Sequence, residues 1–133
     1  MKLMTILMSL LVLGFFSCSS PAKDYLPAEN GLDAGREFID ACLKGDFAKA
    51  SFYMIADEKN KKLLLQVEAN YREKDKEGRQ ELRLASINIK EVAEPNDSTV
   101  IISHSTSLDT TTQQTFILKK GNLWQVDFKQ TNQ

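Results

Sequence analysis

The spacing of apolar residues changes near residue 81, and this change limits the folds open to the chain. Before it, apolar side chains recur every three or four residues, which is the spacing of amphipathic helices. After it, they alternate with polar residues, as in strands that bury one face. Helices followed by such strands favour an α+β fold, with the helices covering one face of an antiparallel sheet.

Three helices are expected before the change, at residues 33–44, 46–55 and 58–74. Asp33 and Asp46 are the predicted N-caps, because a short polar side chain can accept a hydrogen bond from the first turn. Gly45 suits the left-handed conformation that ends many helices. Cys42 falls on the apolar stripe of the first helix, so we expect a buried thiol that packs like a small hydrophobe. The mixed charges of residues 72–81 indicate a fraying helix end and a solvated loop.

Four strands are expected after the change, at residues 82–92, 98–108, 113–120 and 123–128. The apolar phase of the first strand slips by one residue, which predicts a bulge near Ala85–Ser86. Gly121–Asn122 fits a two-residue hairpin loop. Alternation along the last strand places Asp127 at solvent or beside a neighbouring strand. Residues 130–133 are polar, and we expect a frayed tail there.

The N-terminal segment is typical of a secretory signal, because Lys2 is followed by a mostly apolar stretch of 14 residues that ends at Phe16. Crossing a membrane takes roughly 20 apolar residues, so this stretch is too short for a spanning helix. Residues 15–18, Phe-Phe-Ser-Cys, resemble the cleavage motif of bacterial lipoproteins. We therefore expect a signal peptide at residues 1–17 and a lipidated Cys18. The alternative is an uncleaved anchor with a chance cysteine.

Acyl chains on Cys18 would hold the mature protein at a membrane, since two or more chains anchor stably. Ser19 at the next position, rather than aspartate, favours the outer membrane. Residues 18–32 contain two prolines and no sustained period, so a flexible tether is expected there, ahead of a domain at residues 33–129. The expected location is the bacterial cell envelope, facing the periplasm or the cell surface.

Size and charge limit the partners. Removing 17 residues from 133 leaves 116, which suits one compact domain with a single core. Loss of Lys2 leaves 16 basic and 18 acidic residues. This balance lacks the concentrated basic surface of nucleic-acid-binding proteins, so no nucleic-acid partner is expected.

Two segments resemble a group of small bacterial lipoproteins. In residues 34–50 a first helix ends in the step Gly45–Asp46, and residues 118–128 read as an apolar strand, a glycine turn and Trp-Gln-Val-Asp. Both are similar to the domain-of-unknown-function group with a nuclear transport factor 2-like, or cystatin-like, cone fold. The resemblance covers residues 33–128 and implies N-terminal helices packed on a curved antiparallel sheet of about four strands. It implies no particular reaction.

His104, the single histidine, is the first candidate for chemistry. It shares the phase of Val100 and Ile102, so it is expected to point into the concavity of the sheet. Tyr53 and Tyr71 are further candidates for lining a cavity, because isomerase sites place a base beside tyrosine donors in apolar surroundings. The chain shows no metal-ligand spacing and no nucleotide-binding motif, so neither a metal nor a cofactor is expected.

Two functions of different classes remain. The first is a non-catalytic envelope module that binds a small apolar ligand or another envelope protein. The alternative is a small isomerase- or dehydratase-like enzyme that uses His104 with Tyr53 or Tyr71. We favour the first, because the sequence holds no catalytic constellation. A homodimer through the open sheet face, as in some proteins of this fold, is an alternative to a monomer.

Overall fold

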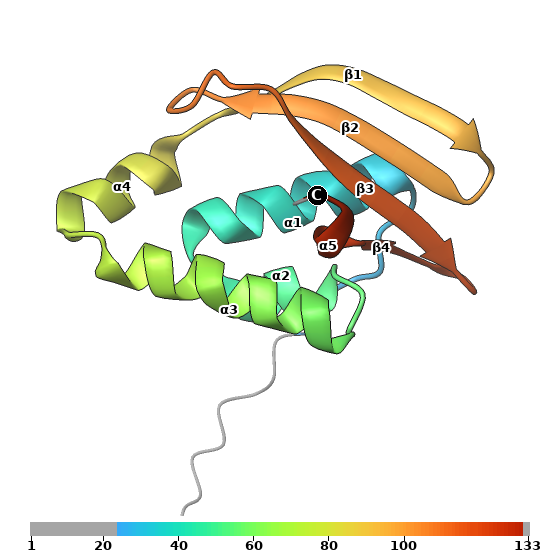
Figure 1. Ribbon diagram of the computed structural model, residues 1–133, viewed down its shortest axis with the longest axis horizontal. Coiled ribbons are helices and arrows are strands. Elements are labelled where there is room, and N and C mark those ends of the chain that lie inside the picture. Colours follow the sequence, from blue (N-terminus) through green and yellow to red (C-terminus); the bar gives the residue numbers. More distant parts are fainter. Residues whose placement is uncertain (1–23, 132–133) are drawn as a thin grey trace, which may run out of the picture.

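The structure, a computed structural model, describes residues 24–131. The expected signal peptide at residues 1–17 and Cys18 lie outside these residues. The described chain forms helices before the sheet and one short helix after it, as shown in Figure 1. The helices are α1 (Gly31–Lys44), α2 (Phe47–Phe52), α3 (Glu58–Glu73), α4 (Lys76–Leu84) and α5 (Phe128–Thr131). The strands are β1 (Ile87–Asn96), β2 (Thr99–Thr106), β3 (Gln113–Lys120) and β4 (Leu123–Val126).

The strands form one antiparallel sheet in the order β1-β2-β3-β4, which confirms the predicted α+β fold with a four-stranded sheet. Consecutive strands pair because short turns join them, and β3 and β4 meet at the predicted Gly121–Asn122 hairpin. Gly121 has a φ of +61°, a conformation that glycine adopts without a steric penalty.

Helix α1 packs against the sheet and supplies much of the core (Figure 1). Gly31 and Gly35 face the sheet, where a Cβ on either residue would collide with Val100 or Ile102. These two glycines therefore allow the helix backbone to lie close to β2. The fully buried aliphatic side chains beneath α1 come from three strands: Ile102, Ile117 and Val126.

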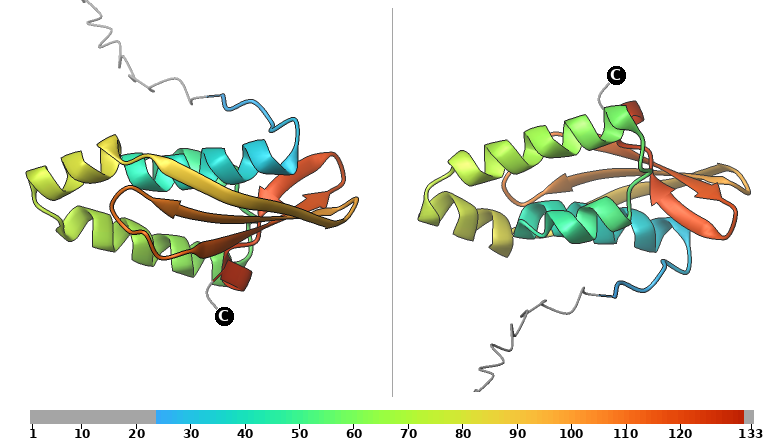
Figure 2. Two further views of the ribbon diagram at one scale, coloured as in Figure 1. Left: turned by 90° about the horizontal axis from the view of Figure 1, so that it is seen from above. Right: turned by 90° about the horizontal axis from the view of Figure 1, so that it is seen from below.

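Figure 2 shows α1 and α3 well separated, with strands of the sheet crossing the space between them. Helix α4 connects α3 back toward the sheet, and α4 contacts α1. Helix α5 lies at the other end of α3 and contacts it. No helix formed by residues 24–131 combines the length and apolar character that crossing a membrane requires.

The helix boundaries confirm one predicted cap and correct the other. Asp46 caps α2, because its side chain accepts a hydrogen bond from the backbone N–H of Lys49 at 3.1 Å. The N-cap of α1 is Asn30, so the prediction for Asp33 was wrong. Asn30 Oδ1 accepts from the backbone N–H of Asp33 at 2.8 Å, which places Asp33 inside the first turn. The helix therefore begins at Gly31, two residues before the predicted cap, in a segment that was expected to belong to the tether.

The charged segment after α3 is a helix, which corrects the predicted solvated loop. Asp75 caps α4 and accepts from the backbone N–H of Gly78 at 2.7 Å. Because α4 runs to Leu84, β1 begins at Ile87, later than predicted, and the slip of apolar phase at residues 82–87 marks a change from helix to strand. The pairing of β1 with β2 has two irregularities, between Ile89 and Glu91 and between Ala93 and Asn96, and neither lies at Ala85–Ser86.

The two ends of the described chain are docked on the domain. The hydroxyl of Tyr53 donates to the carbonyl of Leu26 at 2.7 Å, so part of the predicted tether lies against α2. The strand β4 ends at Val126, and α5 follows where residues 130–131 were expected to fray. Asp127 was expected at solvent or beside a neighbouring strand, and its exposure of 2% excludes the first of these alternatives. Contacts with distant residues, described below, explain both differences.

Candidate functional site

A cleft of about 340 Å³ opens between α1 and α3, beneath β2 and β3, with α4 and α5 at its ends. Its volume lies at the lower end of the range for small-molecule sites, roughly 300–1,000 Å³. The lining side chains come from six elements: Phe38, Ile39, Cys42, Leu43, Val67, Asn70, Tyr71, Lys74, Leu82, His104, Thr106, Gln113, Thr115, Phe128 and Thr131.

Most of the lining surface is apolar. Phe38 of α1 and Phe128 of α5 meet edge to face, with ring centroids 5.2 Å apart. Val67 on α3 and Leu82 on α4 face the same space from the opposite side. Such surroundings favour apolar groups, since each Å² of apolar surface removed from water contributes about 25 cal/mol.

His104 lies on β2 in the phase that the sequence predicts, and it is 4% exposed. Its Nε2 atom lies 2.9 Å from Oγ1 of Thr115 on the neighbouring strand. Its Nδ1 atom is buried and has no hydrogen-bond partner within residues 24–131. Burial lowers the pKa of His104, so the imidazole is neutral at pH 7. A neutral imidazole therefore presents one unused hydrogen-bonding nitrogen.

Tyr71 lines the same cleft with its ring, but its hydroxyl is already engaged. The hydroxyl donates to the carbonyl of Lys44 at 3.4 Å and accepts from Nε of Arg83 at 2.9 Å. Through these two bonds Tyr71 connects α3 to the end of α1 and to α4. The structure thus brings His104 and Tyr71 to one cleft without placing the two polar groups in a shared hydrogen bond.

Tyr53 lies elsewhere. Its ring packs edge to face on Phe52, with centroids 4.9 Å apart, and its hydroxyl bonds to Leu26. Tyr53 is not among the residues that line the cleft. Its position is explained by α2, which ends at Phe52 and leaves Tyr53 as the C-cap.

Two lining threonines were missed by the sequence analysis. Thr115 is 3% exposed and bonds to His104. Thr131 belongs to α5, and its Oγ1 atom is buried without a hydrogen-bond partner in the described part of the chain. Thr115 could have been suspected from its position on an apolar strand. No local signal predicts Thr131, because its burial depends on where the end of the chain docks.

Cys42 contributes its thiol to the cleft and packs against the core, as its place on the apolar stripe predicts. Burial raises the pKa of this thiol to about 12. The thiol is therefore protonated at pH 7 and is a poor nucleophile. Within residues 24–131 no group of three or more histidine, cysteine or carboxylate side chains is arranged to hold a metal ion.

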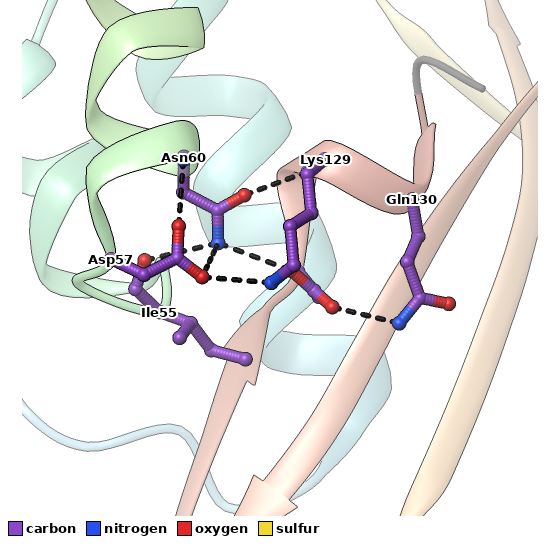
Figure 3. A network of polar contacts seen from close by, with 6 residues as sticks. Ile55, Asp57, Asn60, Lys129 and Gln130 are labelled. Carbon is purple, nitrogen blue, oxygen red and sulfur yellow. Dashed lines mark hydrogen bonds and ion pairs between the residues drawn. The ribbon is translucent and has the colours of Figure 1, made fainter.

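A second polar cluster lies away from the cleft and joins the start of α3 to α5, as Figure 3 shows. Asn60 is fully buried, and its Nδ2 donates to Asp127 Oδ1 at 3.1 Å and to the carbonyl of Ile55 at 3.1 Å. Its Oδ1 accepts from the backbone N–H of Lys129 at 2.7 Å. These bonds bury Asp127 and hold α5 in place.

Charge pairs complete this cluster. Lys129 Nζ lies 2.7 Å from both Asp57 Oδ2 and Asp127 Oδ1. Burial raises the pKa of Asp127, but hydrogen bonds from Lys129, Gln130 and Asn60 outweigh it, so the net pKa is lowered. The hydrogen bond from Lys129 likewise lowers the pKa of Asp57. Each carboxylate of the cluster is paired and none lines the cleft, so the cluster is structural.

Comparison with known protein-family models gives no match, and a search of curated proteins finds none that is similar.

Proposed function

We propose that this protein is a lipid-anchored protein of the bacterial cell envelope whose domain binds a small apolar ligand in the cleft between α1 and α3. The observation that carries the proposal is a cleft of about 340 Å³ with a mainly apolar lining and two buried polar atoms that lack partners within residues 24–131. Buried polar groups are almost always hydrogen-bonded in folded proteins. A ligand that supplies the missing bonds would complete the site.

The anchor is the second part of the proposal, and it rests on the sequence of residues 1–18. We propose cleavage before Cys18, acylation of its sulfur, and retention at the outer membrane. The fold is then a nuclear transport factor 2-like cone on a lipid anchor, similar to the domain-of-unknown-function lipoproteins. The curved sheet over α1 (Figure 1) and the cleft lined by α1, α3 and the sheet support this assignment.

Binding is favoured over catalysis because of how the cleft groups are paired. An enzyme of the alternative class would use His104 as a base beside a tyrosine donor. The imidazole instead contacts the Thr115 hydroxyl, and the hydroxyl of Tyr71 bonds to Lys44 and Arg83. No carboxylate is among the described residues that line the cleft.

The ligand site is tested with the full-length protein in lipid nanodiscs and the apolar probe 1-fluoronaphthalene, followed by ¹⁹F NMR. Val67→Phe fills the cleft from α3. Leu65→Phe, on the same helix, is the matched control, because Leu65 is 63% exposed and does not line the cleft. We expect a bound-probe signal in the wild type and in Leu65→Phe, and its loss in Val67→Phe. Equal signals in all three proteins, or none in the wild type, would refute the ligand site.

The anchor is tested separately by intact-mass measurement of protein purified from membranes. We expect the mass of residues 18–133 plus acyl additions, and a Cys18→Ala variant that is neither processed nor acylated. Normal processing and membrane retention of Cys18→Ala would contradict the anchor without affecting the ligand site.

A further inference from the structure

The cleft contains a small polar region within its apolar lining. His104 Nδ1 and Thr131 Oγ1 both belong to lining side chains, and both atoms are buried and unpartnered within residues 24–131. His104 comes from β2 and Thr131 from α5, so the two groups approach the cleft from different elements. A buried polar group without a hydrogen bond lowers the stability of the folded protein. Two such groups in one cleft are therefore unusual.

The side chains around His104 Nδ1 and Thr131 Oγ1 determine which charge a ligand group that bonds to these two atoms can carry. Lys74 is the only charged residue of the described cleft lining, and it is exposed at the junction of α3 and α4. His104 is 4% exposed, its imidazole contacts the Thr115 hydroxyl, and the other polar residues of the described lining near β2, such as Gln113, are uncharged. A carboxylate beside His104 would lose its hydration, and its one possible cationic partner there is an imidazolium whose charge is also disfavoured by burial. The polar group that meets His104 is therefore uncharged.

The hydrogen-bonding capacity of that group follows from the chemistry of the two protein atoms. Nδ1 of a neutral imidazole is either a donor or an acceptor, depending on which ring nitrogen carries the proton. The Thr115 hydroxyl can serve as donor or acceptor to Nε2, so it is compatible with both forms. The Thr131 hydroxyl can also do either. A ligand hydroxyl, which donates one bond and accepts others, is the group that satisfies both atoms in every arrangement.

We propose that the cleft binds an uncharged amphiphile, an aliphatic chain that carries a hydroxyl, with the hydroxyl bonded to His104 Nδ1 and Thr131 Oγ1. The chain lies along the apolar lining formed by residues such as Phe38, Val67 and Leu82. This inference rests on the proposed ligand site and adds the chemical class of the ligand. A ligand with an acidic head bound by Lys74 at the rim is the competing arrangement.

The test compares decan-1-ol, decanoate and 1-fluoronaphthalene on the full-length protein in nanodiscs. We expect decan-1-ol to bind more tightly than decanoate. We expect His104→Leu and Thr131→Val each to lower the affinity for decan-1-ol roughly tenfold. This is the usual effect of losing one buried hydrogen bond. Binding of 1-fluoronaphthalene, which forms neither hydrogen bond, should change much less than that of decan-1-ol in both variants, and circular dichroism shows that they are folded. Thr112→Val, which removes an exposed hydroxyl outside the cleft, is the control and should change neither probe.

A spectroscopic readout makes the test independent of affinity. The chain has a single histidine, so both imidazole ¹⁵N signals belong to His104, and their couplings to the ring protons distinguish Nδ1 from Nε2. Decan-1-ol should shift the Nδ1 signal, and Thr131→Val should reduce this shift at equal occupancy. Tighter binding of decanoate that depends on Lys74, or an Nδ1 signal unmoved by decan-1-ol, would overturn the hydroxyl inference while leaving the ligand site intact. Failure of all three probes to bind would refute the ligand site itself.

Discussion

The side-chain amide of Asn60, at the start of α3, donates to the carboxylate of Asp127, 67 residues away, at 3.1 Å. Both side chains are buried, and the same amide also bonds to Ile55 and Lys129. One residue thereby connects the helical half of the chain to its last described turn. The docked position of α5, which lines one end of the cleft, depends on this contact.

Asn60→Ala should lower the free energy of unfolding by about 3 kcal/mol, because it removes three hydrogen bonds of a buried amide and leaves the backbone N–H of Lys129 without its partner. Asn70→Ala is the matched control on the same helix. Asn70 is exposed, so its substitution should change stability by less than about 0.5 kcal/mol. Urea denaturation followed by circular dichroism measures both. Equal effects of the two substitutions would contradict the role assigned to Asn60.

Gly31→Ala should destabilise the protein by about 1–3 kcal/mol, because overpacking a close helix–strand contact forces the backbone to move. A Cβ at residue 31 would lie 2.5 Å from Cγ2 and 2.8 Å from Cβ of Val100, and that Cβ cannot move without the strand. Gly35→Ala should cost less. Its nearest contact is Cδ1 of Ile102, the tip of a flexible side chain, and alanine gains roughly 1 kcal/mol of helix propensity. Thermal unfolding of both variants tests this order, and the reverse order would count against it.

The stability of the protein should fall as the pH drops below about 6.5, the ordinary pKa of histidine. Burial lowers the pKa of His104 in the folded protein, so between its two pKa values the unfolded chain binds more protons. The stabilisation is present above pH 6.5 and is lost as the pH falls toward the folded pKa. The measurement is urea denaturation between pH 7.5 and 5.

His104→Leu should lack this part of the pH dependence, since it removes the titrating group. The paired aspartates, Asp57 and Asp127, have lowered pKa values and titrate below about pH 4, outside the window. A wild type whose stability tracks that of His104→Leu from pH 7.5 to 5 would show that the imidazole is not buried as described.

Alkylation of Cys42 by iodoacetamide at pH 8 should be roughly a thousandfold slower in the folded protein than in urea, because the thiolate is the reactive form. Burial raises the pKa of this thiol to about 12. Mass spectrometry of the peptide that contains Cys42 follows the reaction without interference from Cys18. Similar rates in native and unfolded protein would mean that solvent reaches the thiol freely.

The sequence by itself determined the features that depend on neighbouring residues. The Asp46 cap, the left-handed Gly45 and the Gly121 turn rest on bonds or dihedral angles within a few positions, and all three occur as expected. The alternation of Val100, Ile102 and His104 placed the imidazole on the covered face of the sheet for the same reason. Helix caps, turn residues and hydrophobic periodicity can be recognised from the order of residues alone.

Only the tertiary structure decided which of these groups share a site. Asp127, which follows β4, is buried because hydrogen bonds from Asn60 and Lys129 offset the loss of its hydration. Thr131 reaches the cleft because those contacts dock α5, and Tyr53 is kept out because α2 ends early. The physical reason is that burial and pairing depend on contacts between groups tens of residues apart in the sequence. No local sequence pattern predicts which of these groups meet in the folded chain. The cleft, and the hydroxyl chemistry inferred for it, exist only once the chain is folded.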